Sequence, residues 1–297
     1  MLLGVSNPAD PSVPILERIV RQYPTRARFF RTSNHLPNRK IGVLAELARH
    51  ATGEIILIAD GDIAVPPGYL TAVAAHLADP HTGLVTCAYR ARAEDWPGRF
   101  EALGVATDFA PSTMVAPFVG VNEFALGSTI AVRRSDLDRI GGIEAVADYL
   151  ADDYQLGKMI HSLGLRCVLS DVIVETHLAG STWTGVWRHQ VRWARTIRLS
   201  RAGAYWGLPI TQATTCAVLA AIAGLPWWAA ALLVIRMITA LGTGWFVMRS
   251  SDVLKLWWLI PVRDLFASAV WIAGLFGSTV EWGGETLRLT PEGKILR

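Results

Sequence analysis

The chain has 297 residues, of which 52% are hydrophobic and only 18% charged, and its net charge is +3. This charge gives no basis for nucleic-acid binding, and the length allows one large domain or two modest ones. The three cysteines, Cys87, Cys167 and Cys216, are too far apart for a disulfide framework or a cysteine metal site and fit a reducing cytoplasm.

The first residues, MLLGVSNPADPS, contain too short an apolar run for a signal peptide. MLLGV reads as the end of a strand that already lies inside a fold, so we expect the N-terminus to be incomplete. Short amphipathic helices are expected at residues 14–23 and 40–50.

Two aspartates follow an apolar segment at residues 54–60. The segment is rich in isoleucine and predicts a strand buried on both faces of a parallel sheet. Asp60 and Asp62 come at its carboxyl end, where ligands bind in open α/β sheets. A divalent ion that joins two carboxylates to a diphosphate fits this place. An Asp-Gly-Asp turn that only caps the strand remains the alternative.

Strands and helices alternate along the rest of the polar half. A helix is expected at 67–77, and further strands at 83–89, 129–132 and 166–174, with a short helix at 135–139. Alternation of this kind predicts a doubly wound, mostly parallel sheet with helices on its faces.

A second acidic pair, Asp152 and Asp153, stands in the segment YLADDYQLG before an expected helix. One of the two acids could simply stabilise the helix dipole. Adjacent acids with aromatic neighbours also suggest that one carboxylate faces a cleft, where it could take a proton from an attacking hydroxyl.

Composition changes near residues 200–207, which we take as the boundary between a domain at 1–200 and a membrane region at 201–297. Five arginines, with tryptophans beside them, lie on one stripe just before this boundary and favour a helix in the lipid headgroup layer. They are Arg188, Arg192, Arg195, Arg198 and Arg201. Their position before the first apolar stretch places the N-terminal domain in the cytoplasm by the positive-inside rule.

Two apolar stretches, 208–225 and 227–248, predict a helical hairpin of two membrane spans. Arg236 in the second should face a partner helix or a headgroup. The third stretch, 254–276, is interrupted by Pro261 and is either a kinked span or a re-entrant segment. The tail around Gly283-Gly284 predicts a β-hairpin.

Four motifs occur in a fixed order: Asp10-Pro11, ADGD at 59–62, ADDY at 151–154 and HQVRW at 189–193, followed by the apolar region. Together they resemble the membrane-bound inverting glycosyltransferases of the ceramide glucosyltransferase type, and most closely their bacterial relatives in hopanoid biosynthesis. The resemblance covers nearly the whole chain. It implies a GT-A-like α/β fold with a doubly wound mixed sheet and C-terminal transmembrane or interfacial helices.

The resemblance also assigns the donor side of the site. Asp10 matches the first family aspartate, which holds the nucleotide, and Lys40 matches a lysine that reaches the same nucleotide. Asp60 matches the second aspartate and would contact the sugar diphosphate. With Asp62 it would bind Mg²⁺ or Mn²⁺, and the donor would be a UDP-sugar.

On the acceptor side, Asp153 matches the general base, Arg192 the residue that stabilises the departing diphosphate, and Trp193 the residue that shapes the acceptor entrance. His189 departs from the family, which has Gln or Arg there, so its role is open. The family's N-terminal membrane anchor and first strand have no counterpart in these residues.

The implied function is transfer of a sugar from a UDP-sugar to a hydroxyl of a membrane lipid, a hopanoid polyol or ceramide, at the inner membrane with the catalytic domain in the cytoplasm. The hopanoid type is favoured because YLADDYQLG and RHQVRWARTIR resemble that branch more closely. A processive polysaccharide synthase and a polyprenyl-phosphate glycosyltransferase share the motifs and remain alternatives. A membrane-anchored binding module without activity is the third.

Overall fold

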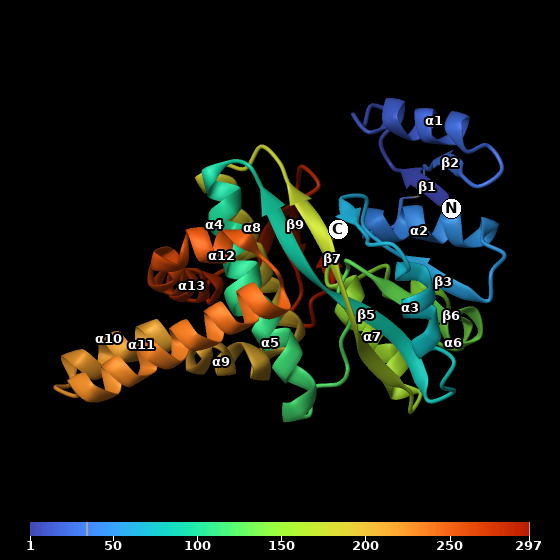
Figure 1. Cartoon of the computed structure of the whole chain (residues 1–297). Helices are drawn as coiled ribbons and strands as arrows, with labels where there is room; N and C mark the ends of the chain where they lie inside the picture. The colour runs from blue at the N-terminus through green and yellow to red at the C-terminus, as the bar shows by residue number, and fades with distance from the viewer. Residues whose placement is uncertain (34, 297) are drawn as a thin grey trace.

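A five-stranded mixed sheet with the order β3-β6-β5-β7-β4 forms the centre of the N-terminal half (Figure 1). The computed structural model describes residues 1–33 and 35–296. The strands of this sheet are β3 (Ile55–Ile58), β4 (Ile63–Ala64), β5 (Thr82–Ala93), β6 (Ile130–Arg133) and β7 (Arg166–Leu178). A separate parallel pair consists of β1 (Leu2–Val5) and β2 (Arg28–Arg31).

The expectation of a mostly parallel sheet is wrong for the five-stranded sheet. Only β5 and β7 run parallel, whereas β6 is antiparallel to both β3 and β5, and β4 is antiparallel to β7. The chain between β5 and β6 is the reason. It contains α4 (Trp96–Gly104), a π-helical turn η1 (Val105–Phe109) and α5 (Ala110–Val115), which pack against C-terminal helices as well as β5. Because this excursion is not a crossover on the sheet, β6 returns antiparallel.

Side chains that alternate along the strands build a core on each face of the sheet. On one face, Leu84 and Ile130 pack with residues of α2 (Arg39–His50) and α7 (Asp152–Ser162). On the other face, their neighbours Val85 and Ala131 pack with α3 (Tyr69–His76). The helices expected at 14–23, 40–50, 67–77 and 135–139 are confirmed, the first and last as α1 (Val13–Gln22) and α6 (Arg134–Arg139).

The strand before the first aspartate pair is not buried on both faces as expected. β3 is an edge strand that pairs only with β6, and Ile55 is exposed while Ile58 is buried. The strand ends at Ile58, two residues before Asp60, so the prediction was wrong about its place in the sheet but right that it leads to this aspartate.

The C-terminal half is helical. After α8 (Trp183–Ser200) come α9 (Ala202–Thr211), α10 (Ala213–Ile222), α11 (Pro226–Leu241), the π-helical turn η4 (Gly242–Val247), α12 (Ser251–Lys255) and α13 (Ile260–Gly274). Helices α10 and α11 lie against each other and project away from the rest of the molecule (Figure 1). Their outer surface is apolar, with Trp227 87% and Ile222 79% exposed.

Two helical segments of the described chain are long and apolar enough to cross a membrane, Pro226–Val247 and Trp96–Val119. The first coincides with the expected span at 227–248, whereas the second was not anticipated. The stretch 208–225 is not one continuous helix: α9 ends at Thr211, after the internal Pro209, and α10 begins at Ala213. Ten residues of helix rise only about 15 Å, roughly half of a hydrocarbon core.

Two arginines of the stripe on α8 bind a neighbouring segment of the chain. Arg195 donates to the carbonyl oxygens of Phe276 and Thr279, and Arg198 donates to those of Gly274 and Gly277. These arginines therefore bind the chain at the C-terminus of α13, where unpaired helix carbonyls favour cations. A role in the lipid headgroup layer is not needed to explain these two residues.

The expected C-terminal hairpin is confirmed. β8 (Thr279–Trp282) pairs antiparallel with β9 (Glu285–Leu289) across Gly283-Gly284, and β10 (Ile295–Leu296) adds a third strand. The nitrogen of Ile295 donates to the carbonyl oxygen of Asp148. The tail thus packs behind the loop that carries the second acidic pair.

Candidate active site

Lys40 lies at the centre of the acidic residues. Its Nζ is 2.8 Å from Oδ1 of Asp60 and 3.4 Å from Oδ2 of Asp152. Burial alone would lower the pKa of Lys40, but the carboxylates of Asp152, Asp60 and Asp153 outweigh it and raise this pKa. Lys40 is therefore a fixed cation among three carboxylates.

Asn38 positions this lysine. It is fully buried and precedes α2 as its N-cap, where its Oδ1 accepts from the backbone nitrogen of Ile41. Its Nδ2 donates to the carbonyl oxygen of Tyr149 at 2.8 Å and lies 3.4 Å from Asp152. One side chain thus joins the start of the lysine helix to the loop of the second acidic pair.

Asp153 lies in the first turn of α7 and contacts the segment before β6. Its Oδ2 accepts from the backbone nitrogen of Gly127 at 2.9 Å, and its Oδ1 accepts from its neighbour Tyr154 at 2.7 Å. Burial and the neighbouring Asp152 raise the pKa of Asp153 to about 6, against the opposing effect of Lys40 and the two hydrogen bonds. Because this pKa lies below neutral pH, the carboxylate is ionised there. The pKa is also close enough to neutral pH for the carboxylate to accept a proton during a reaction.

Gly127 marks the point where these groups meet. A Cβ atom added to it would lie 3.2 Å from Oδ2 of Asp60, 3.4 Å from Oδ2 of Asp153 and 3.4 Å from Nζ of Lys40. Residues far apart in the sequence therefore surround one glycine, whose missing side chain leaves room beside all three charged groups.

Asp62 and Asp10 lie in different settings. Asp62 is exposed, and its Oδ2 accepts from Oγ1 of Thr176 on β7 at 2.9 Å. Asp10 follows β1 and accepts from both the nitrogen and the hydroxyl of Ser12, which lowers its pKa. In residues 1–33 and 35–296 no hydrogen bond or ion pair links Asp10 to Lys40 or Asp60.

Arg192 and Trp193 come to the site from α8. Burial lowers the pKa of Arg192, while the carboxylates of Glu101 and Asp153 act in the opposite direction. An arginine stays charged in proteins, so Arg192 adds a cation to the surroundings of these two carboxylates. Tyr89, Phe109 and Trp193 form a row, with ring centroids 5.2 Å and 5.7 Å apart. Burial, reinforced by Asp153 first among several acids, raises the pKa of Tyr89.

The structure also explains His189. Its Nδ1 lies 2.6 Å from Oε1 of Glu101, which is buried and accepts from Gln190 as well, and its ring contacts Trp193 at 4.6 Å. His189 is therefore held by a carboxylate on α4 and supports the tryptophan.

Four residues of the cluster were missed by the analysis of the sequence: Tyr89, Glu101, Gly127 and Thr176. Glu101 carries the clearest signal, because it is an acid inside a largely apolar segment. The sequence gives no such signal for Gly127 and Thr176, because their contacts depend on the order of the strands in the folded sheet.

The donor set suits a hard divalent cation. Asp60 and Asp62 offer carboxylate oxygens, and Mg²⁺ is commonly bound by one or two carboxylates together with substrate phosphates. Oδ2 of Asp60 and Oδ1 of Asp62 accept no hydrogen bond from the described residues. Within those residues no group of three or more His, Cys, Asp or Glu side chains is arranged to hold a metal. A cation here would thus depend on the phosphates of the donor.

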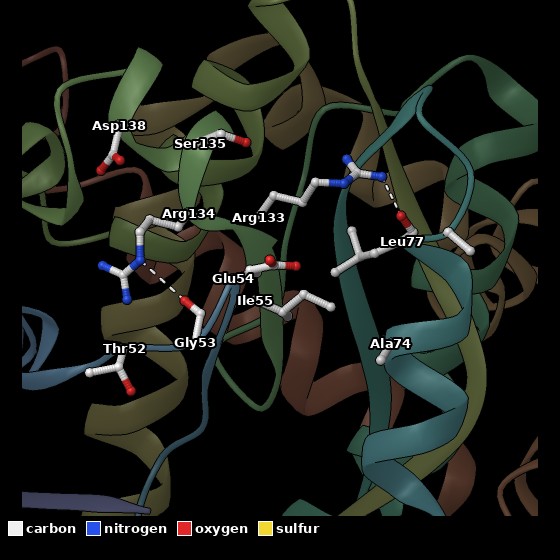
Figure 2. Close-up of a pocket in the computed structure, with 11 residues that line it drawn as sticks. Thr52, Gly53, Glu54, Ile55, Ala74, Leu77, Arg133, Arg134, Ser135 and Asp138 are labelled. Carbon is white, nitrogen blue, oxygen red and sulfur yellow. Dashed lines mark hydrogen bonds between the residues drawn. The ribbon is translucent and has the colours of Figure 1, made fainter.

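A cavity away from these residues plays no part in the site. It measures about 590 Å³ and is lined by residues at the start of β3, the end of α3 and the start of α6 (Figure 2). Its arginines are already engaged, since Arg133 donates to the carbonyl oxygen of Leu77 and Arg134 to that of Gly53 (Figure 2). These side chains hold loops together, and we assign the cavity no part in the site.

Comparison with known proteins gives three results. The family model described as Glycosyl transferase family 21 matches residues 1–295. Ceramide glucosyltransferase 1 of Caenorhabditis elegans is 24% identical over 174 residues, which cover 57% of this chain and 37% of that protein. The chain therefore spans well under half the length of this relative.

The third result is a solved structure, the mannosyltransferase PcManGT from Pyrobaculum calidifontis in complex with GDP-Man and Mn²⁺. It is 22% identical, with a TM-score of 0.52 over 91% of this chain and 77% of that chain. The similarity concerns the fold alone, and it confirms the GT-A-like mixed-sheet architecture expected from the motifs.

Proposed function

The chain belongs to glycosyl transferase family 21, and on that premise we propose that it transfers a sugar from a UDP-sugar to a hydroxyl of a membrane lipid with inversion. The observation that carries the proposal is the meeting of Asp60, Lys40 and Asp153 around Gly127, next to a helical half with an apolar surface. The relationship to a ceramide glucosyltransferase supports a lipid acceptor of the ceramide or hopanoid-polyol kind.

In the proposed reaction Asp153 is the general base. It accepts the proton of the lipid hydroxyl while the oxygen attacks the anomeric carbon, and the bond to the nucleoside diphosphate breaks on the opposite side of the sugar. The hydrogen bonds from Gly127 and Tyr154 fix the position of the carboxylate, and Lys40 favours its ionised form by lowering its pKa. One displacement of this kind inverts the anomeric centre.

The leaving diphosphate needs positive charge around it. We assign Lys40 and Arg192 to this task, because both are cations beside Asp153. Asp60 and Asp62 would hold Mg²⁺ or Mn²⁺, which neutralises diphosphate charge when bound. Trp193 would border the path of the acceptor, and Asp10 would contact the nucleotide.

The membrane assignment rests on the exposed apolar helices. We propose that Pro226–Val247 crosses the inner membrane and that α10 enters it beside this span. The arginines before α9 support a catalytic domain on the cytoplasmic side.

The test is mass spectrometry of lipids after membranes that contain the protein are incubated with a panel of UDP-sugars. We expect a hexose or N-acetylhexosamine added to ceramide or a hopanoid polyol, with release of UDP. Addition of many sugars to one chain would support a polysaccharide synthase instead. No product and no UDP release with any donor would reject the proposal.

The proposal also predicts the pH dependence of the reaction. Because the base must be ionised and the pKa of Asp153 is raised to about 6, kcat/KM should be constant above that pH and fall about tenfold per pH unit below it. The measurement is UDP release between pH 5 and 8 with saturating metal. A flat profile down to pH 5 would contradict the assignment of the base.

A further inference from the structure

A buried carboxylate lies inside an apolar helical segment. Glu101 on α4 is 4% exposed, and its neighbours Phe100 and Ala102 are also buried. The surrounding segment, Trp96–Val119, is apolar enough to cross a membrane. Burying a carboxylate in such surroundings is unfavourable, and apolar residues often replace buried ionic groups without loss of stability. Packing between helices therefore does not account for this residue.

The partners of Glu101 come from another helix. Its Oε1 lies 2.6 Å from Nδ1 of His189 and accepts from Nε2 of Gln190 at 2.8 Å, and both residues belong to α8. Gln190 in turn accepts at its Oε1 from Nη2 of Arg263 on α13, at 3.0 Å. One carboxylate thus joins α4 to α8 directly and to α13 through the amide of Gln190.

Both partners on α8 come shortly before Arg192 and Trp193. The ring of His189 contacts that of Trp193, with centroids 4.6 Å apart. Residues four apart are neighbours on one face of a helix, so an imidazole held in place limits the positions open to the tryptophan. Glu101 therefore acts on Trp193 through one intervening ring.

Glu101 acts on Arg192 through its charge. Burial lowers the pKa of Arg192, and among the carboxylates that oppose this effect Glu101 is stronger than Asp153. With the residues at 1–33 and 35–296 the guanidinium of Arg192 forms no hydrogen bond or ion pair, and its nitrogens are accessible. Its donors are therefore free for a ligand, while a buried carboxylate favours the cation at this place.

We propose that Glu101 is a positioning residue for the transfer reaction, which orients Arg192 toward the donor diphosphate and Trp193 toward the acceptor. The inference rests on the proposed function, in which Arg192 stabilises the leaving diphosphate. An apolar residue at position 101 could pack α4 against α8, but it would offer no acceptor to His189 and no negative charge to Arg192. With Glu101 the cation is in place before the reaction, so it need not be ordered as the diphosphate leaves.

The first measurement is the binding of UDP in the presence of Mn²⁺, by calorimetric titration of the full chain in detergent micelles. Glu101→Gln keeps the size of the side chain and removes its charge. We expect Glu101→Gln and Arg192→Gln each to weaken UDP binding by about tenfold, as for the loss of a hydrogen bond to a charged group. The double variant should bind UDP no more weakly than Arg192→Gln alone, because the first residue acts through the second.

The second measurement is the rate of sugar transfer. Glu101→Gln should lower kcat roughly 10- to 100-fold, as small displacements of catalytic groups do, while the KM of the lipid acceptor stays within about threefold of wild type. Asp252→Asn is the matched control, because it removes the partner of Arg99 on the same helix α4. It should change neither UDP binding nor kcat, and the Tm of Glu101→Gln should be no lower than its own.

Three outcomes decide the inference. Equal UDP binding by wild type and Glu101→Gln, an unchanged kcat, or losses that multiply in the double variant would overturn the role of Glu101 and leave the proposed function standing. If the variants weaken UDP binding as expected but wild type glycosylates no lipid, the proposed function fails and the positioning of Arg192 stands. Wild type that binds no UDP would overturn both. Glu101→Met, which fills the same space with an apolar chain, repeats the test if Glu101→Gln does not fold.

Discussion

Replacing Asp153 by asparagine is expected to lower kcat by about 10²–10⁴-fold, the range associated with loss of a general base. Asparagine has nearly the same shape and keeps an oxygen for a backbone donor, but it cannot take up a proton. Lys40 and Asp60 remain in place, so the dissociation constant of the UDP-sugar should change less than threefold. Single-turnover sugar transfer and calorimetric titration of the donor measure the two effects.

The same variant should not be less stable at neutral pH. The pKa of Asp153 is higher in the folded protein than its ordinary value, so the folded state binds the proton more tightly. Wild-type stability relative to Asp153→Asn therefore decreases as pH rises toward 6 and is constant above it. Asp171→Asn serves as the control. Transfer at the wild-type rate by Asp153→Asn would refute the role of this residue.

The second large effect is expected at Asp264, where replacement by alanine should cost roughly 3–5 kcal/mol of stability, as for other broken buried ion pairs. Arg236 is 8% exposed and bonds Asp264 through Nε at 2.8 Å and Nη2 at 2.6 Å. Its Nη1 donates to the carbonyl oxygen of Thr107 at 2.6 Å. Without Asp264 a charged guanidinium stays buried between α11, α13 and η1 without its partner.

A second Arg–Asp pair provides the control. Arg99 and Asp252 are 2.8 Å apart but 23% and 18% exposed, so Asp252→Ala should cost only about 1 kcal/mol. The double variant Arg236→Met, Asp264→Leu should regain much of the loss, because it leaves no buried charge. The measurement is Tm in detergent. Equal losses for Asp264→Ala and Asp252→Ala would show that burial is not the cause.

Local patterns in the sequence predicted the positions of helices and strands well. They did not predict how the strands are arranged in the sheet. Helix periodicity located α1 and α2, and the turn at Gly283-Gly284 identified the hairpin of β8 and β9. The antiparallel β6 could not be predicted, because its direction depends on helices before it that pack against the C-terminal half. The break at Gln212 was missed because apolar composition alone does not distinguish one helix from two.

The candidate site also was predicted in part: the motifs identified its residues but not the contacts between them. The motifs brought attention to Asp60, Asp153 and Lys40, and the fold places all three around Gly127. Sequence spacing could not reveal that Asn38 ties Lys40 to Asp152, or that Glu101 holds His189. Both contacts join segments far apart in the chain, so only the folded structure shows them. Arg236 was the exception: an arginine in an apolar helix was expected to face a partner helix or a headgroup, and Asp264 of α13 supplies the first of these.

The pairing of β5 with β7 has a geometric consequence. The two strands stay together from Thr82 and Arg166 to Ala93 and Leu178, and Arg90 of β5 donates to the carbonyl oxygen of Met248. A ribbon of this length extends about 40 Å and resists bending more than a loop would. It acts as a strut between the acidic cluster and the apolar helices. Under the proposed function, the height of Asp153 above the bilayer would then be set by the protein, and a lipid would have to present its hydroxyl at that height to be glycosylated.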